Sequence, residues 1–245
     1  MKFLKIIAFF TLVFVFQNCK KDDTPSVNPV ETPIKKDTTT TVTPDTTPLR
    51  YLALGDSYTI GQSVDESLRY PVQLSAALRQ AGRCIAYTRI IAQTGWTTDE
   101  LAAAIQDAKI SDSTYNMVSL LIGVNNQYRN RDTINYRIEF ENLLKQAIRF
   151  ANNKPEKVFV ISIPDYAFTP FGNGNSGISQ GIDRFNEANL EISNKYKIKY
   201  FNITPISRNG LRDPSLVASD GLHPSGKQYT DWVDLMRNDV VNLLK

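Results

Sequence analysis

One serine and the only histidine of the chain are the residues best suited to do chemistry together. Ser57 follows Gly55 and Asp56, whereas His223 lies near the other end of the 245 residues. A serine hydroxyl is a weak nucleophile until a base takes its proton, and imidazole is the side chain whose chemistry suits that role near neutral pH. Asp220, three residues before His223, could hold the imidazole in the required tautomer. These residues predict acyl transfer through Ser57, provided that the fold brings the two stretches together.

Acyl transfer by a serine also needs hydrogen-bond donors that face the negative oxygen of the tetrahedral intermediate. Three candidates are the backbone amides of Ser57 and Gly95 and the side-chain amide of Asn125. Glycine at position 95 would let the backbone approach a substrate closely, and Asn125 offers a fixed NH2 group. An alternative role for Asn125 is to cap the end of a strand.

The chain between residues 49 and 245 alternates short apolar runs with longer stretches of helical periodicity. The runs at 49–54, 84–92, 116–122, 157–163 and 198–203 predict five strands. The stretches at 68–80, 101–109, 133–152, 181–197 and 225–244 predict helices. This alternation predicts an α/β fold with a five-stranded, mostly parallel sheet between two helix layers. A flavodoxin-like strand order, 2-1-3-4-5, is the commonest solution for five strands.

The polar candidates follow the ends of different predicted strands. Ser57 follows the first strand, Gly95 the second, Asn125 the third, and Asp220 with His223 the fifth. The carboxyl ends of parallel strands lie at one edge of the sheet, which is where open α/β sheets bind their ligands. We therefore expect these residues, although scattered in sequence, to converge.

Taken in order, Gly55-Asp56-Ser57, Gly95, Gly123-x-Asn125 and Asp220-x-x-His223 resemble the four sequence blocks of the SGNH, or GDSL, hydrolase family. The resemblance implies a three-layer α/β/α sandwich of the flavodoxin-like type, a catalytic triad of Ser57, Asp220 and His223, and an oxyanion hole from Ser57, Gly95 and Asn125. The chain departs from the family pattern at two positions. Tyr58 stands where the family has leucine, and Asn126 stands where it usually has aspartate. Both departures concern local packing rather than proton transfer.

Several other residues near these blocks have two interpretations. Asp56 could be a second acid, but its position next to Ser57 favours a role in stabilising the turn. Trp96, Tyr166 and Phe168 could form the rim of a substrate pocket, as could Phe171; alternatively, the last three only anchor a loop. The glycine-rich stretch 172–177 lacks the residues of a phosphate-binding loop and is interpreted as a flexible rim.

The first 48 residues differ in composition from the rest of the chain. Lys2 and Lys5 precede an apolar run at 6–16, which is shorter than the ~20 residues that a membrane-spanning helix needs. Cys19 follows, and the segment 1–19 resembles a bacterial lipoprotein signal that ends at a lipidated cysteine. Residues 20–48, rich in Thr, Pro, Asp and Lys, are expected to form a disordered tether. We therefore expect an exported lipoprotein of a Gram-negative bacterium, in the outer membrane, on the cell surface or in the periplasm, with membrane attachment through the N-terminal lipid alone.

Composition narrows the possible partners. Hydrophobic residues make up 42% of the chain and charged residues 22%, as in globular proteins. Without Lys2 and Lys5 the net charge falls from +3 to +1, which gives no argument for nucleic-acid binding. Beyond Cys19 the only cysteine is Cys84, which predicts a small buried side chain and no intradomain disulfide. No group of residues has the spacing of metal ligands, so we expect no metal. We also expect no cofactor and a monomer.

The sequence thus predicts a serine esterase, with short acyl esters of carbohydrates or similar small molecules as substrates. Lysophospholipids or other lipid esters are the alternative substrates, and transfer of the acyl group to an alcohol other than water would use the same residues. A surface binding module that retains the pocket without turnover is a hypothesis of a different class.

Overall fold

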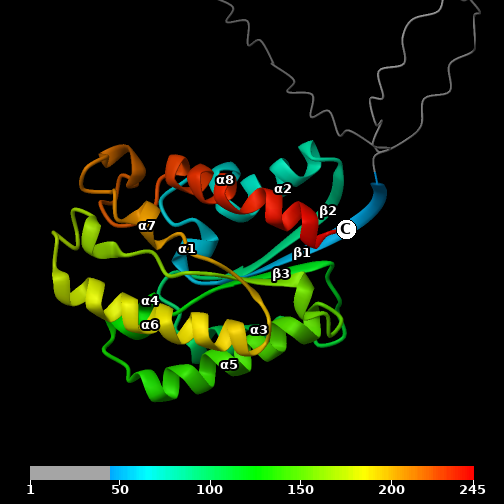
Figure 1. The fold of residues 1–245 in the computed structure, drawn as a ribbon, viewed down its shortest axis with the longest axis horizontal. Coiled ribbons are helices and arrows are strands. Elements are labelled where there is room, and N and C mark those ends of the chain that lie inside the picture. The colour runs from blue at the N-terminus through cyan, green and yellow to red at the C-terminus, as the bar shows by residue number, and fades with distance from the viewer. Residues whose placement is uncertain (1–44) are drawn as a thin grey trace, which may run out of the picture. The chain divides into compact units, whose positions relative to one another are not determined.

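The computed structural model describes residues 45–245 of the chain, and residues 47–245 pack as one unit. Its centre is a sheet of five strands in the order β2-β1-β3-β4-β5 (Figure 1). The strands are β1 (Asp45–Gly55), β2 (Arg83–Ala92), β3 (Met117–Leu121), β4 (Val158–Ile161) and β5 (Lys199–Phe201). The predicted strand order is confirmed.

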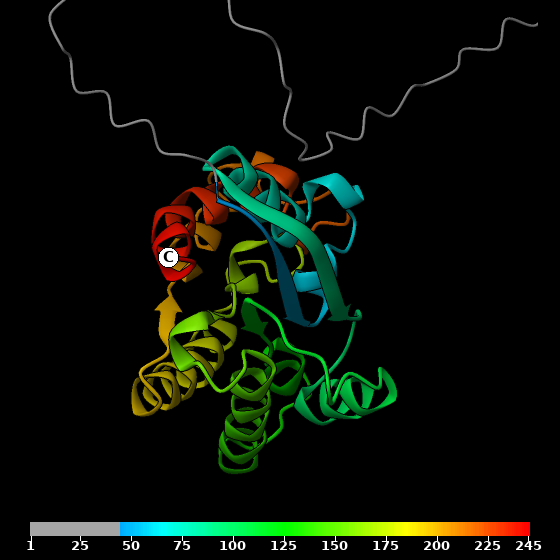
Figure 2. The ribbon, with the colours of Figure 1, turned by 90° about the vertical axis from the view of Figure 1, so that its right-hand side faces the viewer.

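The strands run parallel to one another. Leu54 of β1 lies opposite Leu120 of β3, and β3 pairs with β4, and β4 with β5, in the same sense. Figure 2 shows the arrows of β1 and β2 side by side and pointing the same way. All carboxyl ends therefore meet at one edge of the sheet, as the alternating pattern predicted.

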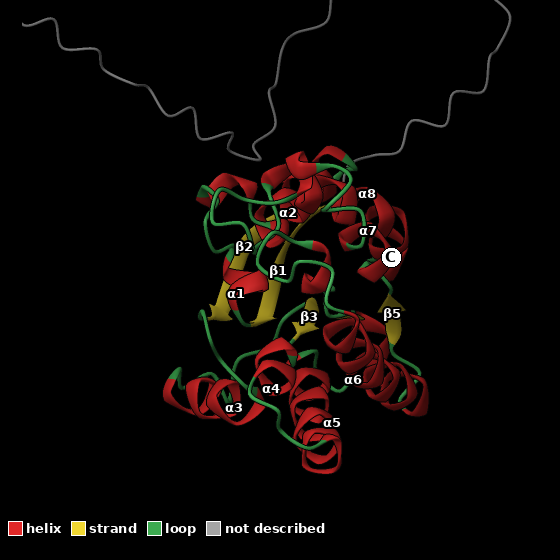
Figure 3. Ribbon diagram, turned by 90° about the vertical axis from the view of Figure 1, so that its left-hand side faces the viewer, coloured by secondary structure: helices red, strands yellow, loops and turns green. Residues whose placement is uncertain are grey.

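Helices cover both faces of the sheet (Figure 3). One layer holds α2 (Tyr70–Gln80), α7 (Thr204–Ser207) and α8 (Gly226–Leu243), and the other holds α3 (Thr98–Asp107), α4 (Val124–Tyr128), α5 (Thr133–Phe150) and α6 (Ser176–Lys195). A short helix, α1 (Ser57–Ile60), follows β1, and 3-10 turns lie at η1 (Glu66–Leu68), η2 (Pro155–Lys157), η3 (Tyr166–Phe168) and η4 (Pro214–Leu216). The predicted three-layer sandwich is confirmed.

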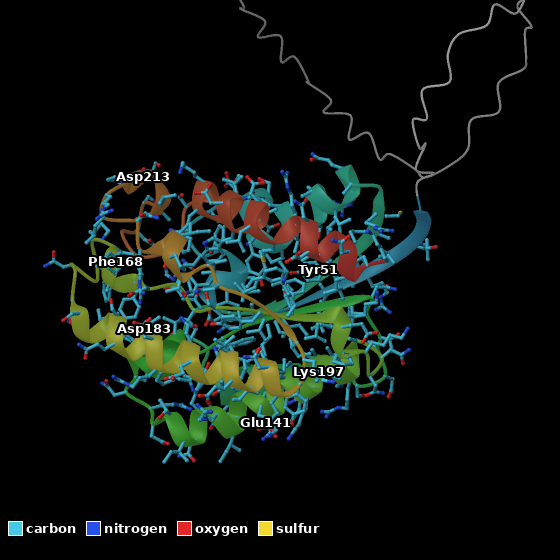
Figure 4. All side chains as sticks on the ribbon, in the orientation of Figure 1. Tyr51, Glu141, Phe168, Asp183, Lys197 and Asp213 are labelled. Atoms are coloured by element: carbon cyan, nitrogen blue, oxygen red, sulfur yellow. The ribbon has the colours of Figure 1, made fainter. Side chains whose placement is uncertain are left out.

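Burial of the central strands explains their sequence. Every residue of β3 and β4 is buried, which is why both strands consist almost entirely of apolar residues. The polar exception is Ser119 of β3, whose hydroxyl bonds the Tyr51 hydroxyl at 2.7 Å and the Tyr70 hydroxyl at 3.2 Å. Tyr51 lies deep among the side chains, whereas Glu141 and Asp213 lie at the periphery (Figure 4). The three buried hydroxyl groups of Tyr51, Tyr70 and Ser119 are thus paired with one another.

Two helices differ in detail from the sequence-based expectation. The apolar periodicity of residues 133–152 predicts a buried stripe of Ile138, Leu144, Ile148 and Ala151. In the structure the face of α5 that packs on the sheet carries Tyr136, Phe140, Leu144 and Ala147, whereas Ile138 is 58% exposed. Two aromatic side chains one turn apart bury more apolar area than a single isoleucine, and they decide which way the helix faces. Helix α6 begins at Ser176 rather than near Gly181, because the Asn175 side chain accepts a hydrogen bond from the Gly177 amide and caps it.

The predicted signal segment ending at Cys19 lies outside the described residues, and so does most of the predicted tether at 20–48. Between residues 45 and 245, no helix combines the length and the apolar character that crossing a membrane requires. Cys84 lies in β2 and is half-buried.

Candidate active site

Ser57 lies at the turn between β1 and α1. The strand ends at Gly55, Asp56 caps the helix with its side chain, and Ser57 is the first helical residue. A Cβ atom at position 55 would come within 2.3 Å of the Leu121 carbonyl oxygen, so only glycine lets this turn pack against β3. The sharp turn places Ser57 at the carboxyl edge of the sheet, where it is 4% exposed.

Asp220 and His223 lie in the loop that precedes α8. The carboxylate oxygen Oδ2 of Asp220 is 2.6 Å from the ring nitrogen Nδ1 of His223. The other oxygen, Oδ1, accepts hydrogen bonds from the backbone amides of Leu222 and His223, both at 2.9 Å. Partial burial tends to raise the pKa of the Asp220 carboxyl, but hydrogen bonds from Ser63, His223 and the Leu222 amide outweigh it and hold the pKa well below its usual range. Asp220 is therefore ionised and fixes the imidazole ring.

A single cavity brings these two loops together. Its volume is about 250 Å³, and Ser57, Gly95, Asn125 and His223 all contribute to its walls. The structure thus gathers four of the five candidates around one space, with Asp220 behind the imidazole. No hydrogen bond joins the Ser57 hydroxyl to His223 in the described residues, and catalytic hydrogen bonds of this kind are often long until substrate binds.

Two of the three candidate oxyanion donors, Gly95 and Asn125, lie on segments that are hydrogen-bonded to each other. The Asn125 side-chain amide donates a hydrogen bond to the Trp96 carbonyl oxygen at 2.9 Å, and the Arg129 guanidinium donates one to the Gly95 carbonyl oxygen at 2.7 Å. Gly95 has a φ of +89°, which glycine adopts without strain. Within residues 45–245, no other hydrogen bond from the Asn125 side-chain amide and none from the Gly95 amide is found. Asn125 is therefore tied to the neighbouring loop rather than acting only as a strand cap.

Asn126, which replaces the usual aspartate, has a structural explanation. Its side-chain oxygen accepts a hydrogen bond from the Thr98 amide at 3.1 Å, and its nitrogen donates one to the Thr98 hydroxyl at 2.7 Å. Asn126 is fully buried. It joins α4 to the start of α3 and so holds the two oxyanion loops in register, a role that needs both a donor and an acceptor.

Asp56 is buried beside the nucleophile and stabilises the turn. Its Oδ1 atom accepts a hydrogen bond from the Tyr58 amide at 3.0 Å, whereas Oδ2 has no partner within the described residues. Burial raises the pKa of Asp56 to about 7, although the nearby backbone amides of Tyr58, Asp56 itself and Gly123 oppose the rise. The carboxyl group acts as a helix cap, which agrees with the turn-stabilising interpretation.

Replacing Asp56 with asparagine should make stability less dependent on pH. Because the folded-state pKa is above the ordinary value, the unfolded chain ionises at lower pH than the folded chain, and the free energy of unfolding falls as pH rises from about 4 to about 7. Over this pH range the contribution of Asp56 to the free energy of unfolding falls by roughly 4 kcal/mol. Relative to the parent protein, Asp56→Asn should gain stability over this range and keep the gain above pH 7, as measured by urea unfolding at several pH values.

Asp132 provides the matched control, since it is also a capping aspartate. It accepts hydrogen bonds from the Ile134 and Asn135 amides, and the bonds from Asn135 lower its pKa. The ionised Asp132 carboxylate stabilises the fold at pH values above the pKa that this group has in the unfolded chain. The contribution is lost as the pH falls and the carboxylate becomes protonated. Asp132→Asn should therefore be less stable than the parent at neutral pH, with the difference shrinking in acid. Identical pH profiles for the parent and Asp56→Asn would contradict the buried-acid assignment.

Aromatic residues form the apolar wall of the cavity. Tyr166 and Phe171, two of the expected rim residues, line it together with Tyr128 and Tyr58. The rings of Tyr128, Tyr166 and Phe171 form a triangle with centroids 6.3 Å apart on each side. Tyr128 was not among the residues singled out from the sequence; its position three residues after Asn125, on the same face of α4, is the signal that could have found it.

Two expected rim residues lie elsewhere. Trp96 is half-buried and packs against the hydrophobic core, and only its backbone carbonyl faces Asn125. Phe168 belongs to η3 and is half-buried in the outer part of the molecule (Figure 4). Neither residue is part of the cavity wall.

Among residues 45–245, no group of histidine, cysteine, aspartate or glutamate side chains could hold a metal ion.

Comparisons with solved structures reveal several proteins of the same fold. The esterase EstA from Pseudoalteromonas is 17% identical, with a TM-score of 0.61 over 79% of this chain and 97% of its own. An acetyl xylan esterase from Geobacillus stearothermophilus is 18% identical, with a TM-score of 0.55 over 78% and 94%. Phospholipase A1 from Streptomyces albidoflavus is 17% identical, with a TM-score of 0.58 over 78% and 99%. At these identities the likeness concerns the fold alone.

Sequence comparison identifies the family. No curated protein matches the chain significantly. The model of the GDSL-like Lipase/Acylhydrolase family matches residues 53–230, which include Ser57, Gly95, Asn125, Asp220 and His223. The predicted family is therefore confirmed: this chain belongs to the GDSL-like lipases and acylhydrolases, enzymes that hydrolyse ester bonds.

Proposed function

We propose that the cavity is the active site of a serine esterase with a Ser57–His223–Asp220 triad. The observation that carries the proposal is that one space of about 250 Å³ is walled by Ser57, His223, Gly95 and Asn125. This observation supports the proposal, because a substrate in that space would contact the nucleophile, the base and the oxyanion donors together.

In the proposed mechanism His223 removes the proton from the Ser57 hydroxyl as the oxygen attacks the ester carbonyl carbon. The Ser57 and Gly95 amides and the Asn125 side chain donate hydrogen bonds to the oxyanion. The imidazolium, stabilised by Asp220, then protonates the leaving alcohol, and the acyl group stays on Ser57. Water, deprotonated by His223, then attacks the acyl-enzyme. The bond between the acyl carbon and the Ser57 oxygen breaks, His223 returns the proton to that oxygen, and the acid leaves.

Two features of the cavity support a small substrate: one concerns the acyl group next to Ser57, and the other concerns the alcohol part of the ester. The volume lies below the 300–1,000 Å³ of typical ligand pockets. Tyr128 and Phe171 line the cavity and are 57% and 55% exposed, so their aromatic rings are accessible to a substrate. Such faces bind flat apolar surfaces, including those of a sugar ring. We therefore propose short acyl esters of carbohydrates, or similar small esters, as substrates.

The second candidate function is that of a lipid esterase. The similar structures include both an acetyl xylan esterase and a phospholipase A1, so the fold supports either substrate class. The two proposals differ in the chain length that the site accepts, which a homologous series of esters measures directly.

Rates with p-nitrophenyl acetate, butyrate and octanoate should separate these substrates. We expect kcat/KM to be highest for acetate or butyrate and about 10-fold or more lower for octanoate, because excess methylene groups cannot enter the cavity. A maximum at octanoate would replace the carbohydrate proposal with the lipid one.

A serine-directed phosphonate separates an enzyme from an inert binding module on the same scaffold. It should label the full chain at one residue, which peptide mass spectrometry should identify as Ser57. Substitution of the exposed Ser219 should leave the labelling unchanged. A chain that stays unmodified, with no turnover of any ester, would favour the binding module.

A further inference from the structure

Asp220 is held by a residue from a distant part of the chain. The Ser63 hydroxyl donates a hydrogen bond to Oδ2 of Asp220 at 2.6 Å, across 157 positions of sequence. This is the same oxygen that lies 2.6 Å from Nδ1 of His223. One carboxylate oxygen therefore serves two donors, one from the loop after α1 and one from the imidazole ring.

The backbone at Ser63 is unusual in a way that makes this contact possible. Gly61 ends α1 with a φ of +72°, and Ser63 has a φ of +65°. Left-handed backbone is uncommon for residues with a side chain and costs free energy. The loop therefore holds Ser63 in a backbone conformation that glycine would adopt more easily. A glycine at this position, however, would have no hydroxyl to bond Asp220.

We infer that Ser63 is a fourth, positioning residue of the active site, which orients Asp220 and limits how strongly that carboxylate holds a proton on His223. The inference deepens the proposed function and rests on it. A carboxylate oxygen that accepts a charge-assisted hydrogen bond from a hydroxyl has less negative charge to share with a second donor. Removing the hydroxyl should therefore strengthen the pairing of Asp220 with protonated imidazole and make His223 a base only at higher pH.

Other titratable groups lie near the pair and are the same in the parent and in the Ser63 variants. Tyr58 of α1 and Tyr229 of α8 both lie within electrostatic reach of Asp220, and Tyr166 lines the same cavity as His223. Asp56 and Asp165 lie near Tyr58 rather than beside the pair itself. The Tyr58 ring packs edge-on to the His223 ring, with centroids 5.7 Å apart. Within the described residues none of these five side chains bonds Asp220, so Ser63 is the side chain outside the Asp220–His223 loop that does.

The sole histidine of the sequence makes the test direct. In the full chain, produced without a histidine tag, every imidazole NMR signal belongs to His223, and its titration midpoint can be measured whether or not the protein is active. We expect the midpoint to rise by about 0.5 pH unit in both Ser63→Ala and Ser63→Gly. The acid limb of the kcat/KM profile should move by the same amount, a loss of about threefold below the midpoint.

The two variants separate positioning from backbone strain. Both lack the hydroxyl, but Ser63→Gly relieves the left-handed backbone and should have the higher Tm. Ser219→Ala, which removes an exposed hydroxyl next to Asp220 in sequence, should leave the midpoint unchanged. A shift in both variants at position 63 supports the inference. An unchanged midpoint in both, or a shift in Ser63→Ala alone, would overturn it. Failure of the proposed function would be seen in a different measurement: the phosphonate would not label the parent protein. That result does not depend on the NMR titration.

Discussion

Replacing Ser57 with alanine should lower kcat for p-nitrophenyl acetate by about 10⁴-fold or more. The variant has no atom that can form the acyl-enzyme, and the oxyanion donors alone give only residual rate enhancement. Ser57 begins α1 but does not cap it, since Asp56 does so. The substitution should therefore leave Tm nearly unchanged. Initial rates, with Tm as the folding check, test this expectation.

His223→Gln should cause a loss of similar size, and the combination of the two substitutions should cost no more than either alone. The effects of substituting residues that act as one unit are not additive, because the remaining residues contribute little to kcat once one of them is lost. Losses that multiply in the double variant would mean that Ser57 and His223 act independently. Equal activity in Ser57→Ala and the parent would end the serine mechanism altogether.

Asn125→Ala should lower kcat by about 10²- to 10³-fold with little change in KM. The side-chain amide donates to the oxyanion, which exists only in the transition state and the intermediate, so its loss acts on the chemical step. Steady-state rates with the short ester give both constants. A change confined to KM would show that Asn125 binds the ground state instead.

The substitution also removes the hydrogen bond from Asn125 to the Trp96 carbonyl oxygen. Arg129→Ala is the matched control, because it removes the other side-chain tether of the same loop, at the Gly95 carbonyl, without removing an oxyanion donor. If loop position were all that mattered, the two variants would lose similar activity. We expect the arginine variant to lose about 10-fold or less. The comparison separates electrostatic stabilisation from loop placement.

The sequence alone was sufficient to predict the architecture. The fully apolar runs of β3 and β4 can exist only with both faces covered, and strands that alternate with helices give a parallel sheet. Once the strands are parallel, residues that follow them share one edge, so the gathering of Ser57, Gly95, Asn125 and His223 could be predicted without coordinates. These features depend on local pattern and on chain connectivity, which a sequence records directly.

The tertiary structure alone decided which side chains complete the site. Nothing in the residues around Ser63 indicates that its hydroxyl reaches Asp220, and Trp96, adjacent to Gly95 in sequence, packs toward the core while Tyr128 takes a place in the cavity wall. The same holds for α5, where Tyr136 and Phe140 rather than Ile138 face the sheet. The physical reason is that side-chain direction and loop-to-loop contact depend on packing between distant segments, whereas periodicity fixes only the backbone elements that carry them.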